Sequence, residues 1–179
     1  LVSGSLQQPA HDLKRALVAQ GFAAADLPIP AHPLAVLAAV GDPMQALAAG
    51  LLLELAANGV AVLPAGGSQM AAVLALALAL APPALRPRLQ RWVGLATTGW
   101  VAREVDSDLA LLLRRIGERW EVEPLALAAD LHFRGAVHPA LADYERGYVK
   151  EGVGAGGLAL LWQLSGRDPA ALAHACDRA

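Results

Sequence analysis

From residue 34 onward, the sequence repeats one pattern: a short apolar run, a loop rich in glycine, proline or hydroxyl residues, and a longer stretch of helix formers. Such alternation predicts βα units, and nearly all-apolar strands suit a parallel sheet covered on both faces. We expect strands at residues 34–40, 60–63, 92–96 and 125–129. Helices are expected at residues 44–57, 68–80, 108–118, 139–147, 155–164 and 169–177. The pattern predicts an α/β fold of three layers, with a mostly parallel, Rossmann-like sheet between helices.

The first 33 residues do not follow this pattern. One helix is expected at residues 11–20, ended by Gly21, and Pro28-Ile29-Pro30 is expected to form an extended connector. We therefore divide the chain into an N-terminal helix with its connector, residues 1–33, and an α/β domain, residues 34–179. A total of 179 residues is the usual size of one domain. Because residue 1 is Leu rather than Met, we expect a fragment of a larger domain, cut from a longer chain.

Composition narrows the function classes. The chain has 14 basic and 16 acidic residues and a net charge of −2, so we expect no nucleic-acid partner. Only 17% of the residues are charged and 56% are apolar, which predicts a buried subunit interface and hence a homodimer. The single cysteine, Cys176, cannot form an intramolecular disulfide or a cysteine-based zinc site, and it favours a reducing, cytoplasmic location.

A segment without charged residues lies between Leu55 and Leu85, but glycine, proline and polar residues interrupt it. Its longest apolar run, residues 70–81, is shorter than the roughly 20 residues that span a bilayer, so we expect no membrane segment. The histidines lack the i, i+4 spacing of a metal site, and we expect neither a metal ion nor a cofactor. The four tryptophans show no stacking rhythm and are assigned to the core or to an interface.

Three loops carry candidate binding residues, and the first is Gly41-Asp42-Pro43-Met44-Gln45. Gly41 permits a turn, while Asp42 and Pro43 suit the start of a helix. Asp42 and Gln45 are also candidate contacts to a ligand hydroxyl, and a well-made helix start alone would explain the same residues.

The second loop, Ala65-Gly66-Gly67-Ser68-Gln69-Met70, opens the helix expected from residue 68, with Ser68 as a candidate N-cap. Gly66 and Gly67 let a ligand approach the backbone, and a helix start presents N–H groups and a partial positive charge to an anion. Gly66, Gly67, Ser68 and Gln69 are therefore candidate phosphate or ribose contacts. Many α/β turns need glycine for geometry alone, so that alternative stays open.

The third loop, Lys150-Glu151-Gly152-Val153-Gly154-Ala155-Gly156-Gly157, leads into the helix expected at residues 155–164. Because its glycines lie at the start of a helix, we expect a phosphate to be bound by backbone N–H groups, those of Gly152, Gly154, Ala155 and Gly156. The loop matches neither the P-loop nor the dinucleotide-binding fingerprint, because the lysine ending and the final glycine spacing differ.

Two further candidates accompany the loops. Glu151, at the lip of the third loop, can act as a general base beside a desolvated aromatic ligand. The alternative is a solvated glutamate paired with Lys150 or Arg146. Thr97 and Thr98 follow an expected strand and can bond phosphate or ribose, although hydroxyl residues there are as often turn residues.

The three loops together resemble a known family. In order and spacing, they are similar to the archaeal and cyanobacterial branch of nicotinate-nucleotide:dimethylbenzimidazole phosphoribosyltransferase, the CobT family. The block from Val149 to Gly157 is the most specific, and the similarity runs from about residue 34 to residue 164, which corresponds to the carboxyl-terminal half of the usual family protein. The chain departs from the family pattern at Val153, where a hydroxyl residue is usual, at the Gly41 loop and at Ala65-Gly66.

The resemblance implies an enzyme that transfers phosphoribose from nicotinate mononucleotide to 5,6-dimethylbenzimidazole or a related base, forming α-ribazole phosphate in cobalamin assembly and releasing nicotinate. It implies that Glu151 is the general base, because a Glu-Gly-Thr/Ser-Gly-Ala segment with that role aligns with residues 151–155. The glycine cradles would hold the nucleotide phosphate. A second function stays open, that of a non-catalytic module of the same fold that binds a nucleotide or another phosphorylated ligand.

Overall fold

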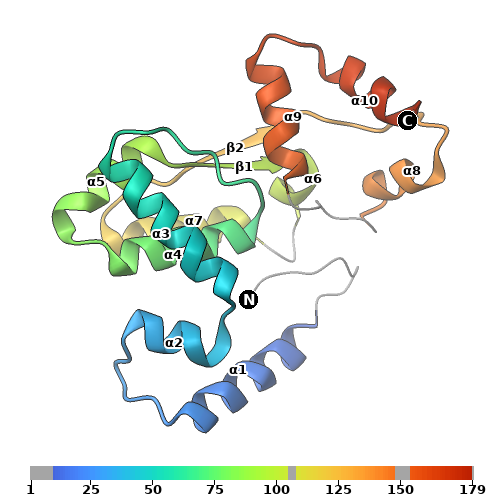
Figure 1. Cartoon of the computed structure of the whole chain (residues 1–179). Coiled ribbons are helices and arrows are strands. Elements are labelled where there is room, and N and C mark those ends of the chain that lie inside the picture. Colours follow the sequence, from blue (N-terminus) through green and yellow to red (C-terminus); the bar gives the residue numbers. More distant parts are fainter. Residues whose placement is uncertain (1–9, 105–107, 148–153, 179) are drawn as a thin grey trace.

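The centre of the fold is a short parallel sheet of two strands, β1 (Gly94–Thr98) and β2 (Leu125–Ala129), paired from Gly94 opposite Leu125 to Thr98 opposite Ala129. The computed structural model describes residues 10–104, 108–147 and 154–178, and in these the chain has an α/β fold with ten α-helices (Figure 1). The helices are α1 (His11–Ala25), α2 (Pro33–Val40), α3 (Pro43–Ala57), α4 (Ser68–Leu80), α5 (Arg86–Trp92), α6 (Gly99–Ala102), α7 (Leu109–Trp120), α8 (Pro139–Glu145), α9 (Ala155–Leu164) and α10 (Pro169–Asp177).

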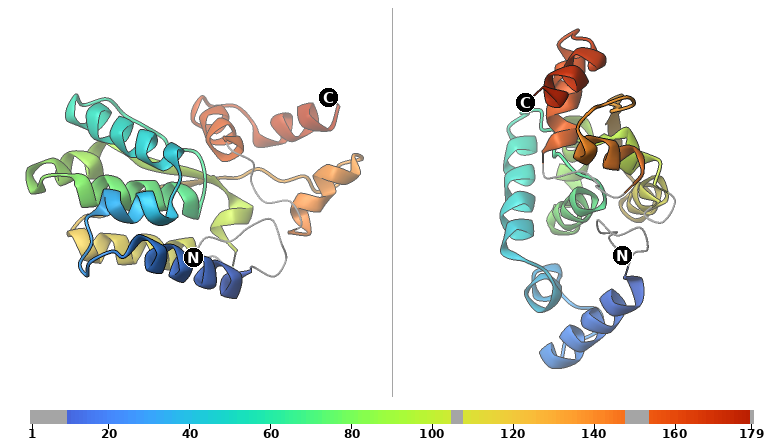
Figure 2. Two further views of the ribbon diagram at one scale, coloured as in Figure 1. Left: turned by 60° about the horizontal axis from the view of Figure 1, so that its bottom comes forward. Right: turned by 90° about the vertical axis from the view of Figure 1, so that its right-hand side faces the viewer.

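Successive residues of β1 belong to two different apolar clusters. Leu95 lies in a first cluster with buried residues of α3, α4 and α7, whereas Ala96 lies in a second cluster with Ala159 and Leu160 of α9. Because neighbouring side chains of a strand point to opposite faces, helices cover both faces of the small sheet. Figures 1 and 2 show α1 and α2 at one end of the molecule and α10 at the other.

Helix α2 forms where the sequence predicted a strand at residues 34–40. His32 Nδ1 accepts the N–H of Leu34 at 3.3 Å, and Pro33 occupies the first turn, which are both signals of a helix start. Leucine and alanine, which favour helices, supply five of the seven residues. The strand prediction was wrong here because a short apolar run does not distinguish a strand from a helix.

Residues 60–63 are not a regular strand, although the segment lies beside β1. It makes two isolated parallel bridges, Val62 with Val93 and Ala65 with Ala96. Pro64 O accepts the N–H of Ala96 at 2.9 Å, but Pro64 has no N–H to donate. The proline therefore divides a third strand into two bridges, which the apolar pattern alone did not predict.

Helix α1 continues through Gly21, where the sequence predicted its end. A Cβ atom at Gly21 would lie 2.5 Å from Val40 Cγ1 and 2.9 Å from Ala39 O. The glycine thus allows α1 to approach α2 closely and does not end the helix. The helix ends instead at Asp26, whose φ of 45° lies in the left-handed region.

The other predicted elements are close to those observed. The helices at residues 68–80, 155–164 and 169–177 are confirmed, although Gly67 and not Ser68 is the N-cap of α4. The strand predicted at residues 92–96 begins two residues later, because α5 extends to Trp92, and it includes Thr97 and Thr98. None of the described helices is long and apolar enough to cross a membrane. The domain division at residue 33 stays a prediction.

A carboxylate joins the end of α10 to the start of α8. Asp177 accepts the backbone N–H groups of His138 and Val137, each at 2.9 Å. The N–H of His138, followed by that of Val137, lowers the pKa of Asp177 below its ordinary value of 3.8. Because the pKa is lower in the folded chain, the carboxylate stabilises this contact above the ordinary pKa, and that stabilisation is lost as the pH falls through the folded value.

We expect Asp177→Asn to weaken this contact, because an amide oxygen can accept one N–H while its NH₂ group faces the other. Amide hydrogen exchange should show lower protection factors at Val137 and His138, and the variant should lose the fall in protection that acidification causes in the native chain. Native protection of both amides in the variant would contradict this role of Asp177.

Candidate functional site

Three of the segments predicted to bind ligand meet at the carboxyl ends of the strands. The N–H of Gly66 donates to Ala96 O of β1 at 2.8 Å. On the other side of this segment, a Cβ atom added to Gly157 of α9 would lie 2.6 Å from Ala65 Cβ. The loop before α4, the end of β1 and the first turn of α9 are therefore in direct contact, where ligands bind in parallel α/β sheets.

Neither of the two glycine-led helices is capped by a side chain. Gly67 is the N-cap of α4 and Gly154 is the N-cap of α9, and neither glycine provides a side-chain cap for its helix. By contrast, side chains cap α2, α3, α7 and α10, from His32, Asp42, Asp108 and Asp168. The first turns of α4 and α9 thus keep N–H groups that can bind an anion.

An apolar cavity of about 440 Å³ lies beside the first turn of α9. Four aromatic rings line it, those of Trp100, Phe133, Tyr144 and Trp162. Thr98, Ala155 and Cys176 also border it, together with aliphatic side chains of α8, α9 and α10. A cavity of this volume accommodates a small organic ligand, and its apolar wall favours a flat, uncharged one.

The aromatic rings contact one another in a defined arrangement. Trp100 stacks on Phe133 with ring centroids 5.3 Å apart and lies 5.1 Å from Tyr144, and Phe133 meets Tyr144 edge-on at 5.5 Å. Across the cavity wall, Trp162 Nε1 donates to Asp168 O at 2.8 Å. These contacts hold the rings in place, so the wall is preformed.

Trp100 also carries an unused donor. Its Nε1 is buried and has no hydrogen-bond partner among the described residues. A buried donor without a partner costs about 1–3 kcal/mol, so the fold carries this cost at the cavity wall.

The remaining predicted site residues lie elsewhere or outside the described part of the chain. Thr98 borders the cavity, and its Oγ1 accepts the N–H of Val101 at 3.4 Å; Thr97 lines a different hollow, beside α7. Asp42 and Gln45 form a capping box at the start of α3 and do not line the cavity. Glu151 and Gly152 lie outside the described residues.

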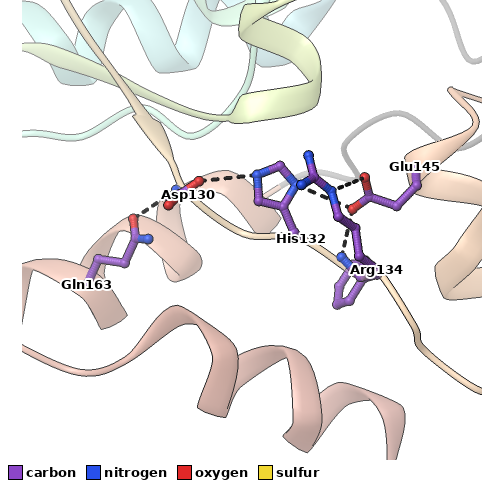
Figure 3. Close-up of polar contacts among 6 residues, drawn as sticks. Asp130, His132, Arg134, Glu145 and Gln163 are labelled. Carbon is purple, nitrogen blue, oxygen red and sulfur yellow. Dashed lines mark hydrogen bonds and ion pairs between the residues drawn. The ribbon is translucent and has the colours of Figure 1, made fainter.

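A polar cluster centred on His132 borders the aromatic rings (Figure 3). His132 Nε2 lies 3.2 Å from Asp130 Oδ1, and Nδ1 lies 3.4 Å from Glu145 Oε1, without the geometry of a hydrogen bond. Because the two carboxylates approach opposite ring nitrogens, a single metal ion cannot bind all three side chains. Within the described ranges, no group of three or more potential ligands is placed to hold a metal ion.

The chain matches no family model. It is 50% identical over 184 residues to a UPF0284 protein of Parasynechococcus marenigrum, with 100% of this chain and 46% of that protein covered. UPF0284 proteins of Prochlorococcus marinus and Gloeobacter violaceus are 48% and 50% identical over 100% and 99% of this chain, each with 46% of the relative covered. Its close homologues are UPF0284 proteins. The chain spans about half the length of these curated relatives, and their shared name states no activity.

The sequence did not indicate the aromatic wall. The pattern assigns Trp100 and Trp162 to the core or an interface and gives no signal at Phe133 or Tyr144. The four rings come from α6, the segment after β2, α8 and α9, so no period within one element relates them. Only the position of Trp100, two residues after Thr98 at a strand end, was a usable signal.

We expect Gly157→Ala to destabilise the chain by about 1–3 kcal/mol, because the added methyl group would overlap Ala65 and push α9 from the loop before α4. Gly50→Ala is a matched control, since Gly50 also lies in a helix but has no atom within 4 Å of an added Cβ. That control should stabilise the chain by about 0.5–1 kcal/mol. Denaturant unfolding measures both changes, and equal effects of the two substitutions would contradict the close contact.

Proposed function

We propose that this chain carries the nucleotide-binding and base-binding parts of a phosphoribosyltransferase that moves phosphoribose from nicotinate mononucleotide to 5,6-dimethylbenzimidazole or a related base. The observation that carries the proposal is that the glycine-led start of α9 borders an aromatic cavity near the carboxyl ends of β1 and β2 and also contacts the loop before α4. The phosphate and the aromatic base of one reaction need these two environments side by side.

The two halves of the site suit the two substrates. The N–H groups at the starts of α4 and α9 suit the nucleotide phosphate, with Gly66, Gly67 and Gly154 letting the ligand approach the backbone. The cavity lined by Trp100, Phe133, Tyr144 and Trp162 suits a flat, uncharged benzimidazole. The motif resemblance of the three loops supports the same assignment.

Glu151 is the proposed general base, three residues before Gly154 in the sequence. In the proposed step, its carboxylate takes the N–H proton of the benzimidazole while the other ring nitrogen attacks ribose C1′. The bond between C1′ and the pyridinium nitrogen breaks, and its electron pair neutralises the ring that leaves as nicotinate. The products are α-ribazole phosphate and nicotinate, with one proton on Glu151.

The larger assembly is part of the same proposal. Three leucines on one side of α9, Leu158, Leu161 and Leu164, are more than half exposed, at 72%, 53% and 62%. Such a face favours a covering partner, for which we propose a second copy in a cytoplasmic homodimer. We also propose that the two-stranded sheet belongs to a larger, three-layer Rossmann-like sheet in the longer protein.

Phosphate recognition is tested first. We expect nicotinate mononucleotide to bind more tightly than nicotinate riboside, by about threefold to thirtyfold, because only the nucleotide has a phosphate for the two helix starts. Isothermal calorimetry on the two ligands measures the difference. Equal affinities would contradict a phosphate site at α4 and α9.

Catalysis is tested at Glu151. We expect Glu151→Gln to lower the rate of nicotinate release by about 10² to 10⁴, because glutamine keeps the shape of glutamate but cannot accept the proton. Nucleotide affinity should hardly change. The assay follows nicotinate release from nicotinate mononucleotide with 5,6-dimethylbenzimidazole, on the full-length protein that carries this sequence.

Two other results have distinct meanings. A variant within threefold of native turnover would remove Glu151 from the mechanism and favour a solvated ion pair, worth about 0–1 kcal/mol. A native protein that binds the nucleotide but releases no nicotinate would favour the non-catalytic binding module.

A further inference from the structure

We propose that His132 is a positioning residue for the aromatic cavity. The inference rests on the proposed function only for the identity of the base that binds there. His132 does not line the cavity itself, so its effect would pass through the rings that do.

His132 connects elements that are distant in the sequence. Asp130 directly follows β2, and its N–H donates to Gln163 Oε1 of α9 at 3.1 Å. Glu145 is the last residue of α8. With its two ring nitrogens facing Asp130 and Glu145, His132 links the end of β2 and α9 to α8 (Figure 3).

The same contacts fix the aromatic rings. Glu145 Oε1, which faces His132, also accepts the N–H of Phe133 at 2.7 Å, and Phe133 stacks on Trp100. Tyr144 precedes Glu145 on α8 and contacts Trp100 as well. The imidazole itself meets Trp100 edge-on, with centroids 6.2 Å apart and an interplanar angle of 86°. Trp100 thus contacts His132 directly. Phe133 and Tyr144 are both linked to Glu145, the first by a backbone hydrogen bond and the second as its neighbour in α8.

The exposed fractions of the side chains indicate which of the two contacts of His132 contributes more to holding it in place. The side chains of His132 and Glu145 are 27% and 23% exposed, whereas that of Asp130 is 78% exposed. A solvent-exposed polar contact contributes little, so the contact between His132 and Glu145 should dominate. Arg134 Nε, 3.9 Å from Glu145 Oε2, would still partly balance the glutamate charge in a His132 variant.

The test compares His132→Phe, which keeps a flat ring and removes both nitrogens, with His132→Gln, which restores one donor and one acceptor. His11→Phe, on α1 at the far end of the molecule, is the control. The first readout is the ¹⁹F resonance of fluorotryptophan at Trp100, assigned with Trp100→Phe. We expect His132→Phe to shift or broaden this resonance, His132→Gln to restore it in part, and the control to leave it unchanged.

The second readout is the dissociation constant of two ligands, measured separately by calorimetry. We expect His132→Phe to weaken binding of 5,6-dimethylbenzimidazole about tenfold while nicotinate mononucleotide changes less than about twofold. Glu145→Gln should have a similar effect, and the double variant should be little worse than either, because both act on one contact.

Three outcomes would overturn the proposal. They are an unchanged Trp100 resonance in His132→Phe, an equal loss of affinity for both ligands with a lower melting temperature, and additive effects of the His132 and Glu145 substitutions. If the native protein binds no dimethylbenzimidazole, the proposed base is wrong, and the Trp100 resonance alone then decides the role of His132.

Discussion

The site depends on how closely α9 approaches the segment before α4. Gly157 leaves no room for a side chain against Ala65, and Gly156 and Ala159 are also buried, so the helix can lie across both strands. Each helix start carries roughly half a positive charge, and two uncapped starts brought together repel each other. An anion held near both relieves that repulsion. The close contact therefore shapes the site, and in the proposed function the two helix starts would favour a negatively charged group there.

The aromatic wall and the helix starts should contribute different amounts of free energy to ligand binding. Burial of an aromatic side chain or ligand ring contributes about 1.5–3 kcal/mol, whereas a charge near an exposed helix start contributes about 0.3–1 kcal/mol. Affinity for an aromatic base should therefore come mainly from Trp100 and its neighbours, and the backbone N–H groups should orient the phosphate.

The sequence predicted well what depends on local chemistry and predicted poorly what depends on tertiary contacts. Helices α9 and α10 and strand β2 follow from apolar runs bounded by glycine, proline or aspartate, and the structure confirms their limits. The run at residues 34–40 was ambiguous, and capping by His32 made it a helix. Gly21 resembled a helix stop, but it serves the contact between α1 and α2, which no local pattern encodes.

The candidate site, too, could be predicted from the sequence only where it depends on local chemistry. The glycine loops were visible in the sequence because glycine at a helix start has a specific use, and the structure brings Gly66 and Gly157 to the same place. The pair Thr97 and Thr98 illustrates what sequence proximity cannot resolve, since alternation along β1 sends the two side chains to opposite faces. The aromatic rings come from separate elements and meet only in the folded chain.

The proposed subunit contact and the proposed base site are not independent, because they share one residue. Leu158 borders the aromatic cavity and is also 72% exposed on the outer face of α9. A partner that covers Leu161 and Leu164 would therefore also cover this side of the cavity. Exclusion of water would strengthen both the aromatic contacts and the bonds from the N–H groups of α9 to an anion. Assembly and ligand binding should thus favour each other, since each buries the apolar surface that the other leaves incomplete.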